Sequence, residues 1–117
     1  MINPIGKAKK RRLKKYGSEK DFFAEVWGER PHVCAVCHYP LREPLRNVFS
    51  HIYSKGAYPQ LRYCKLNLEL WCCTILRSDG KQGCHNLWHN NPVKFWARAE
   101  MYGWQKPELQ YLLSIIN

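Results

Sequence analysis

The chain has 117 residues, with 19 lysines and arginines against nine aspartates and glutamates, so its formal net charge is +10. This length suits one small domain with a modest core. The 45% hydrophobic content excludes a wholly disordered protein, and no apolar run approaches the roughly 20 residues of a membrane span. The charge excess favours an acidic partner, and nucleic acid is the first candidate.

The positive charge is concentrated near the start of the chain. Seven cations fall within nine residues: Lys7, Lys9, Lys10, Arg11, Arg12, Lys14 and Lys15. Without them, 12 basic residues face nine acidic ones, and the net charge is only +3. We expect residues 1–16 to be a solvated basic arm that contacts DNA phosphates and adds sequence-independent affinity. A solubility tail without a partner is the alternative.

The first half of the chain predicts one helix and extended segments. Ser18 is a good N-cap, and a helix over residues 17–29 places its apolar residues on one face. Residues 30–46 contain three prolines and predict loops with short strands. A strand-like run at 48–53 precedes a long loop, and a second extended piece containing Asn67 leads to Trp71.

The second half of the chain predicts helices. The pattern becomes helical at Cys84, a helix beginning near Pro92 ends at Gly103, and a last helix follows Pro107. We therefore expect a single small α+β domain over residues 17–117. The tryptophans of this half are expected to fill its core: Trp88, Trp96 and Trp104.

Six cysteines in so small a protein indicate disulfides or a metal site. Cys34 and Cys37 form a CxxC knuckle, which turns two thiolates toward one tetrahedral ion. A second pair comes from Cys72 or Cys73 together with Cys84, and the polar segment between them can loop out. We predict a structural Zn²⁺ that couples metal binding to folding. A disulfide framework is disfavoured because residues 1–16 lack the pattern of a signal peptide, and a redox CxxC is disfavoured because no βαβ pattern surrounds this motif. The unused cysteine and Cys64 are expected to be ordinary thiols.

Three histidines are candidate site residues. His51 ends the first strand-like run, while His85 and His89 are four residues apart at a predicted helix start. Both rings of that pair can project from one helix face and bind one divalent cation. His32 and His38 flank the first knuckle without a matching role. His38 is expected on the surface, and a place beside the zinc ligands is the alternative.

These motifs together resemble a known family. The order CxxC, His-Ile, Pro-x-Leu-Arg, Asn, Cys and Cys-His-x-x-x-His is similar to the HNH nucleases of the His-Me finger (ββα-metal) superfamily. The stretch SHIYSKGAYPQLRYCKLNLELWC resembles small phage HNH proteins and the phage lambda NinG (Rap) recombination nuclease family. GCHNLWHNNP resembles the helix of the phage group. The likeness covers residues 34–96 and implies a zinc-stabilised ββα-metal domain with flanking helices.

The resemblance also implies roles for particular residues. His51 would be the general base that activates water, and Asn67 would brace the loop that orients it. His89 would ligate a catalytic Mg²⁺, Mn²⁺ or another divalent ion, and His85 would be a second ligand or a phosphate contact. Arg62 matches a family position and is a candidate phosphate contact. The spacing from Asn67 favours Cys72 over Cys73 as the zinc ligand.

Two positions depart from the family pattern. Ser50 stands where many HNH enzymes have a metal-binding Asp or His, and a hydroxyl is a poor ligand. The segment between Cys72 and Cys84 is also longer than a two-residue knuckle. Neither departure removes the base, the asparagine or the helix histidine.

The resulting expectation is a metal-dependent DNA endonuclease that nicks or cleaves DNA in phage DNA metabolism, in the cytoplasm of a bacterial host. Its substrate would be branched recombination intermediates or duplex DNA, and its partner a phage recombination or packaging protein. One alternative is a non-catalytic, zinc-stabilised DNA-binding module. Another is an accessory protein that binds a partner through apolar residues of its last helix: Leu109, Leu112, Leu113 and Ile116.

Overall fold

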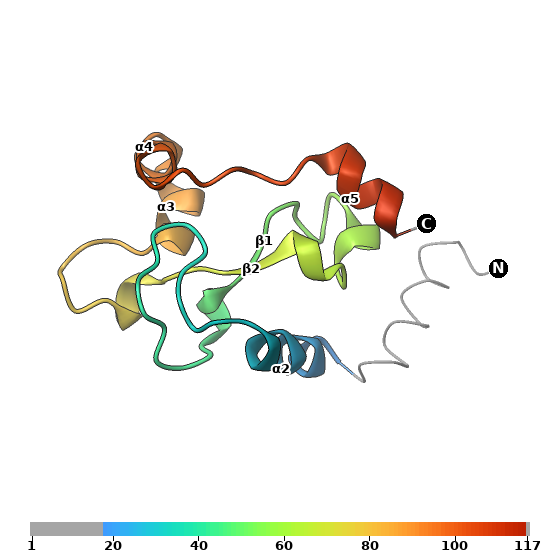
Figure 1. Cartoon of the computed structure of the whole chain (residues 1–117), viewed down its shortest axis with the longest axis horizontal. Helices are drawn as coiled ribbons and strands as arrows, with labels where there is room; N and C mark the ends of the chain where they lie inside the picture. Colours follow the sequence, from blue (N-terminus) through green and yellow to red (C-terminus); the bar gives the residue numbers. More distant parts are fainter. Residues whose placement is uncertain (1–17, 117) are drawn as a thin grey trace. The chain divides into compact units, whose positions relative to one another are not determined.

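The computed structural model describes residues 18–116, which form an α+β structure (Figure 1). The elements are helix α2 (Glu19–Glu29), strands β1 (Phe49–His51) and β2 (Leu68–Leu70), and helices α3 (Cys84–Asn90), α4 (Pro92–Tyr102) and α5 (Leu109–Ile115). Short 3₁₀ turns occur at Arg46–Val48, Pro59–Leu61, Lys65–Asn67 and Thr74–Leu76. The predicted α+β class is confirmed. The basic arm at 1–16 lies outside the described residues.

The described residues group into two compact units. The first unit contains residues 18–30, 51–68 and 107–116, and the second contains residues 31–50 and 69–106. Each unit is built from segments that are distant in sequence. The extent of a single domain over residues 17–117 stays a prediction.

Strands β1 and β2 pair with each other to form a two-stranded sheet. The Ile52 amide donates to the Asn67 carbonyl (2.9 Å), and the Trp71 amide donates to the Val48 carbonyl (2.8 Å). Residue numbers increase along β1 while those of their partners in β2 decrease, so the two strands are antiparallel. Both strands are shorter than the predicted extended runs.

Helix α2 in the first unit follows the sequence closely. Its N-cap is Ser18, whose hydroxyl accepts a hydrogen bond from the Asp21 amide (3.3 Å). Phe22 and Val26, one turn apart, are fully buried. The Phe22 ring meets Tyr63 edge-on, with centroids 5.3 Å apart. The helix predicted over residues 17–29 is therefore confirmed.

Helix α5 covers a small core of the first unit. Leu112 is buried with Leu61 and Cys64, and three partly buried residues of α5 and its end pack against this cluster: Leu109, Leu113 and Ile116. The Tyr53 hydroxyl donates to the Pro107 carbonyl at 2.7 Å, where the segment leading to α5 begins. This apolar face therefore covers the unit's own core, which weighs against its use as a partner-binding surface.

An aromatic cluster forms the core of the second unit. Trp71 and Phe95 are fully buried, with ring centroids 5.1 Å apart. One oxygen of Glu69 accepts hydrogen bonds from the indole N–H groups of Trp71 (2.8 Å) and Trp104 (2.9 Å). Trp96 differs from the prediction because it is 43% exposed. Helix α4 turns Phe95 and Ala99 inward, and this leaves Trp96 at the edge of the cluster.

Asn67 also differs from the prediction, because it ends the 3₁₀ turn Lys65–Asn67 and does not lie in an extended segment. The turn closes with the Leu68 amide donating to the Lys65 carbonyl. Asparagine favours turns because its side chain hydrogen-bonds to nearby backbone.

None of the helices within residues 18–116 has the length and apolar character of a membrane span.

Candidate functional site

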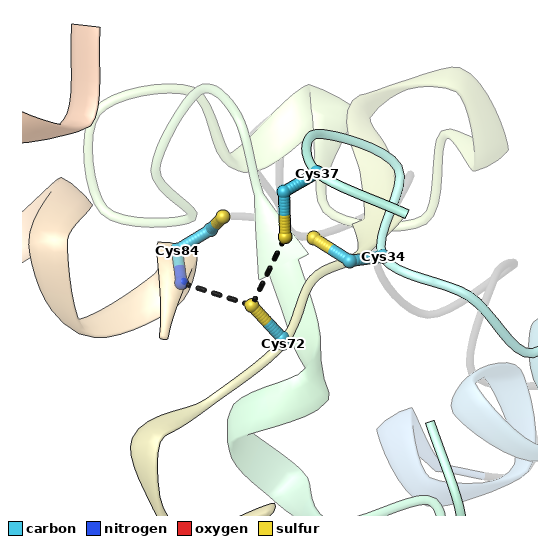
Figure 2. A group of neighbouring side chains, drawn as sticks. All are labelled: Cys34, Cys37, Cys72 and Cys84. Carbon is cyan, nitrogen blue, oxygen red and sulfur yellow. Dashed lines mark hydrogen bonds between the residues drawn. The ribbon is translucent and has the colours of Figure 1, made fainter. Parts of the chain in front are cut away.

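Four cysteines of the second unit form a buried cluster. The sulfur atoms of Cys34, Cys37, Cys72 and Cys84 lie within 4.8 Å of one another, and Figure 2 shows them pointing toward one another. Cys37 Sγ and Cys72 Sγ are 3.6 Å apart. Zinc–sulfur bonds of about 2.3 Å in a tetrahedron place the sulfurs about 3.8 Å apart, so the cluster has the size of a four-thiolate zinc site. The structure confirms that these cysteines could hold one metal ion, and it places Cys72 in the cluster.

The first knuckle is a tight turn. The His38 amide donates to the Cys34 carbonyl (2.9 Å), and the Cys34 amide donates to the Tyr39 carbonyl (2.8 Å). His38 has a φ of 65°, in the left-handed region that non-glycine residues rarely adopt. This conformation reverses the chain directly after Cys37. His38 is exposed, as predicted, and so is His32.

Gly83 allows the start of α3 to approach the second cysteine pair. A Cβ at this position would lie 2.3 Å from the Cys73 Cα and 2.6 Å from the Cys72 carbonyl oxygen, which is closer than real contacts allow. The approach lets the Cys84 amide donate to Cys72 Sγ (3.2 Å) and the His85 amide donate to the Cys72 carbonyl (3.0 Å). In the sequence Gly83 predicts only a chain break, so this role was missed.

Two arginines donate to the cluster sulfurs. Arg77 Nη1 lies 3.1 Å from Cys72 Sγ and 3.5 Å from Cys37 Sγ, and Arg98 Nη1 lies 3.5 Å from Cys84 Sγ. Asp79 holds the Arg77 guanidinium through Nε and Oδ1 at 3.0 Å. Four thiolates and one Zn²⁺ carry a net charge of −2, so two guanidinium groups balance the centre. The segment between Cys72 and Cys84 loops out, as expected, but it also returns Arg77 to the sulfurs.

The thiols of the cluster have unequal acidity. The pKa of Cys72 is lowered to about 6, first by a hydrogen bond from Cys34 and then by Cys84, including its backbone amide. The pKa of Cys37 is also lowered, while hydrogen bonds among the thiols and burial raise the pKa of Cys34. Cysteine binds metal as the thiolate, and the lowered pKa of Cys72 and Cys37 favours that form.

Ser50 and the helix histidines form a second group in the second unit. Ser50 is buried, and its hydroxyl oxygen lies 2.7 Å from His85 Nδ1. The rings of His85 and His89 have centroids 4.8 Å apart. Burial, with a contribution from His89, lowers the pKa of His85 to about 4, so its ring is neutral near pH 7. If Ser50 accepts the Nδ1 proton, Nε2 of His85 has a free lone pair for a metal.

The histidine pair by itself is a sparse ligand set. Among residues 18–116, the four-cysteine cluster is the only group of three or more His, Cys, Asp or Glu ligand atoms close enough to hold one ion. His85 and His89 would therefore supply two protein ligands, and water would complete the coordination. The Ser50 hydroxyl contacts His85 Nδ1 and thus orients the His85 ring.

His51 and its partners lie in the first unit. Its Nε2 is 3.0 Å from the Arg62 carbonyl oxygen, and its ring lies 6.0 Å from that of Phe23. A carbonyl only accepts, so Nε2 carries the proton and Nδ1 has the lone pair. Burial lowers the pKa of His51 below its ordinary 6.5, although the Arg62 carbonyl pulls in the opposite direction. His51 is therefore a neutral imidazole near pH 7.

Asn67 clamps the loop that follows His51. Its side chain is fully buried. Oδ1 accepts from the Tyr53 amide (2.8 Å), while Nδ2 donates to the carbonyls of Tyr53 (3.0 Å) and Leu61 (3.2 Å). These side-chain hydrogen bonds hold the backbone of Tyr53, which follows His51 closely, and of Leu61, in the 3₁₀ turn at 59–61. The role of Asn67 in bracing the loop that orients His51 stays a prediction.

Comparisons with protein-family models, curated proteins and solved structures find no match to this chain. The resemblance to HNH nucleases, and the catalytic roles that it implies, stay predictions. The cysteine cluster is seen in the geometry of the sulfur atoms, which does not depend on this resemblance.

We predict that the purified protein contains about one tightly bound zinc per chain, since closing this cluster couples metal binding to folding. Cys72→Ser should lose the zinc and unfold at lower temperature. Cys73→Ser should retain both zinc and stability, because Cys73 is equally buried but lies outside the cluster. Elemental analysis and thermal denaturation measure this. Equal zinc content in the two variants would contradict the assignment.

We predict that Asn67→Ala lowers the free energy of unfolding by about 3 kcal/mol, because it leaves buried backbone groups without their hydrogen bonds. Asn47→Ala, at an exposed position, serves as the control and should change stability by less than about 0.5 kcal/mol. Denaturant unfolding measures both variants. If they are equally stable, Asn67 does not clamp the loop.

Proposed function

We propose that this protein is a metal-dependent DNA endonuclease of HNH type, built on a ββα-metal (His-Me finger) fold. The observation that carries the proposal is the state of His51. Its Nε2 donates to the Arg62 carbonyl, which leaves the lone pair on Nδ1, and burial lowers its pKa so that the ring is neutral near pH 7. A general base for phosphodiester hydrolysis needs this state near pH 7.

The proposed reaction assigns a task to each group. His51 Nδ1 takes a proton from water as the water oxygen attacks the phosphorus, and the bond to the leaving sugar oxygen breaks. Asn67 keeps the loop after His51 in place through its hydrogen bonds to Tyr53 and Leu61. His89 and His85 would hold a divalent ion, which supplies positive charge to the phosphate and the leaving oxygen.

The charge distribution supports DNA as the substrate. The seven cations at residues 7–15 would contact phosphates without reading sequence. The resemblance to phage HNH and NinG proteins extends the proposal to phage recombination or packaging in a bacterial host. Duplex, nicked, flap and four-way DNA are the substrates to compare.

A second candidate function is a zinc-stabilised DNA-binding module without catalytic activity. The observation that favours it is the small ligand set, because Ser50 replaces the family's carboxylate and contacts His85 through its hydroxyl. In that case DNA binding would persist with no cleavage under any divalent ion.

We predict that the zinc-loaded protein nicks supercoiled plasmid or branched DNA with Mg²⁺ or Mn²⁺, and that His51→Ala slows cleavage by about 10²- to 10⁴-fold, the usual contribution of a general base. DNA affinity should remain unchanged. His32→Ala, at an exposed histidine beside the first knuckle, is the control and should cleave like the wild type. Intact DNA with the wild-type protein, together with retained binding, would support the second candidate.

We predict that Ser50→Ala weakens activation by Mn²⁺ about 10- to 100-fold, since groups that orient a metal-binding histidine contribute this much to affinity. Ser50→Thr keeps a hydroxyl and should retain most of the affinity. Zinc content should be equal in both variants. The measurement is the Mn²⁺ concentration giving half-maximal cleavage. No shift in that concentration would mean that Ser50 does not orient a metal ligand.

A further inference from the structure

Three charged side chains of the first unit form an ion cluster next to His51. Lys55 Nζ lies 3.0 Å and 3.1 Å from the two carboxylate oxygens of Glu19, and Arg62 Nε lies 3.0 Å from one of them. Lys55 and Glu19 are 36 positions apart, so no local sequence pattern indicates this pairing. Two cations thus converge on one anion.

The cluster is accessible from solvent. The side chains of Lys55 and Arg62 are 37% and 25% exposed, while that of Glu19 is 17% exposed. Burial raises the pKa of Glu19, but hydrogen bonds from Lys55 and Arg62 outweigh it and lower the pKa overall. The carboxylate is therefore ionised near neutral pH. The two cations exceed its charge by one.

The cluster also lies within electrostatic range of the proposed base. Glu19 raises the pKa of His51, whereas Lys55 and Arg62 lower it. The carbonyl of Arg62 accepts the His51 Nε2 hydrogen bond, so the arginine that binds Glu19 is the residue that orients the base. An anion held by these cations would lie beside His51.

We infer that Lys55 and Arg62 form a binding site for one phosphate group of a DNA backbone, and that the Glu19 carboxylate occupies this site in the free protein. The inference rests on the proposed function for the identity of the polyanion. Carboxylate and phosphate oxygens accept the same donors, and a phosphate pairs well with a guanidinium and an ammonium. The phosphate exchanges with the carboxylate, and no covalent bond changes.

Glu19 is well placed to leave the cations. It lies in the first turn of α2, directly after Ser18, and the helix N-terminus stabilises its negative charge when the ion pairs break. In the sequence, the seven-cation run ends three residues before Ser18. DNA bound by that run would therefore bring its phosphates to the segment that carries Glu19.

Helix α2 offers a matched control for testing this exchange. Glu25 lies on the same helix and pairs with a different lysine, Lys65, at 3.4 Å. Lys65 also pairs with Glu29 at 2.7 Å, so it keeps a partner when Glu25 is neutralised. Glu19→Gln and Glu25→Gln change the net charge equally, and only the first would vacate the phosphate site.

The test measures the affinity of the zinc-loaded full chain for a fluorescent 20-base-pair duplex by anisotropy, over a range of salt concentrations. Glu19→Gln should tighten binding about three- to tenfold, the size expected from releasing two partly exposed ion pairs. Glu25→Gln should change it less than about twofold. Adding Arg62→Met to Glu19→Gln should remove the gain and reduce the logarithmic salt slope by about 0.9, the value of one phosphate contact.

Each contrary outcome has a separate meaning. Equal affinities for Glu19→Gln and Glu25→Gln would overturn this inference and leave the proposed function standing. Absence of salt-sensitive DNA binding in every variant would overturn both. Titrating inorganic phosphate while observing the Arg62 Nε–H resonance separates the sources. A response of Glu19→Gln to inorganic phosphate but not to the duplex would identify a free-anion site and overturn the DNA assignment.

Discussion

Four cysteine sulfurs packed into one buried cluster set the main physical constraint on this structure. Sulfurs within 4.8 Å of one another cannot all ionise without a cation among them, because like charges at that distance repel strongly. A tetrahedral Zn²⁺ removes the conflict, and Arg77 and Arg98 balance the remaining charge. The ion would then join three separate segments of the second unit, so binding it contributes directly to folding.

The cysteine cluster also positions a proposed catalytic group. Cys84 is the first residue of α3, and Gly83 lets that end of the helix approach the backbone of Cys72. His85 follows at once and meets Ser50. In the first unit, the Arg62 carbonyl orients His51 and Asn67 holds the loop between them. A helix that begins at the cysteine cluster thus supports one histidine, and a hydrogen-bonded loop supports the other.

Local sequence patterns predicted much of the fold, but they did not predict the contacts between residues that are far apart in the sequence. Ser18 with the apolar spacing after it predicted α2, and Pro92 with Gly103 predicted the limits of α4, where Gly103 has a φ of 74°. The cysteine spacing predicted the cluster. No local pattern links Arg77 to Cys37 or Glu19 to Arg62, since these partners are 40 and 43 positions apart. The 3₁₀ turn that ends at Asn67 was not predicted. The Asn67 side chain hydrogen-bonds to the backbone of Tyr53 and Leu61, and no local sequence pattern shows which backbone groups it binds.

X-ray absorption spectroscopy at the zinc edge tests the central claim most directly, because it reports the ligands around the ion. The account predicts four sulfur ligands at about 2.3 Å with no nitrogen or oxygen ligand in the protein as purified. It also predicts that the zinc signal is lost in Cys72→Ser, and that the spectrum of Cys73→Ser is unchanged. A spectrum dominated by nitrogen or oxygen ligands would show that the ion is held elsewhere, and would contradict the four-cysteine centre.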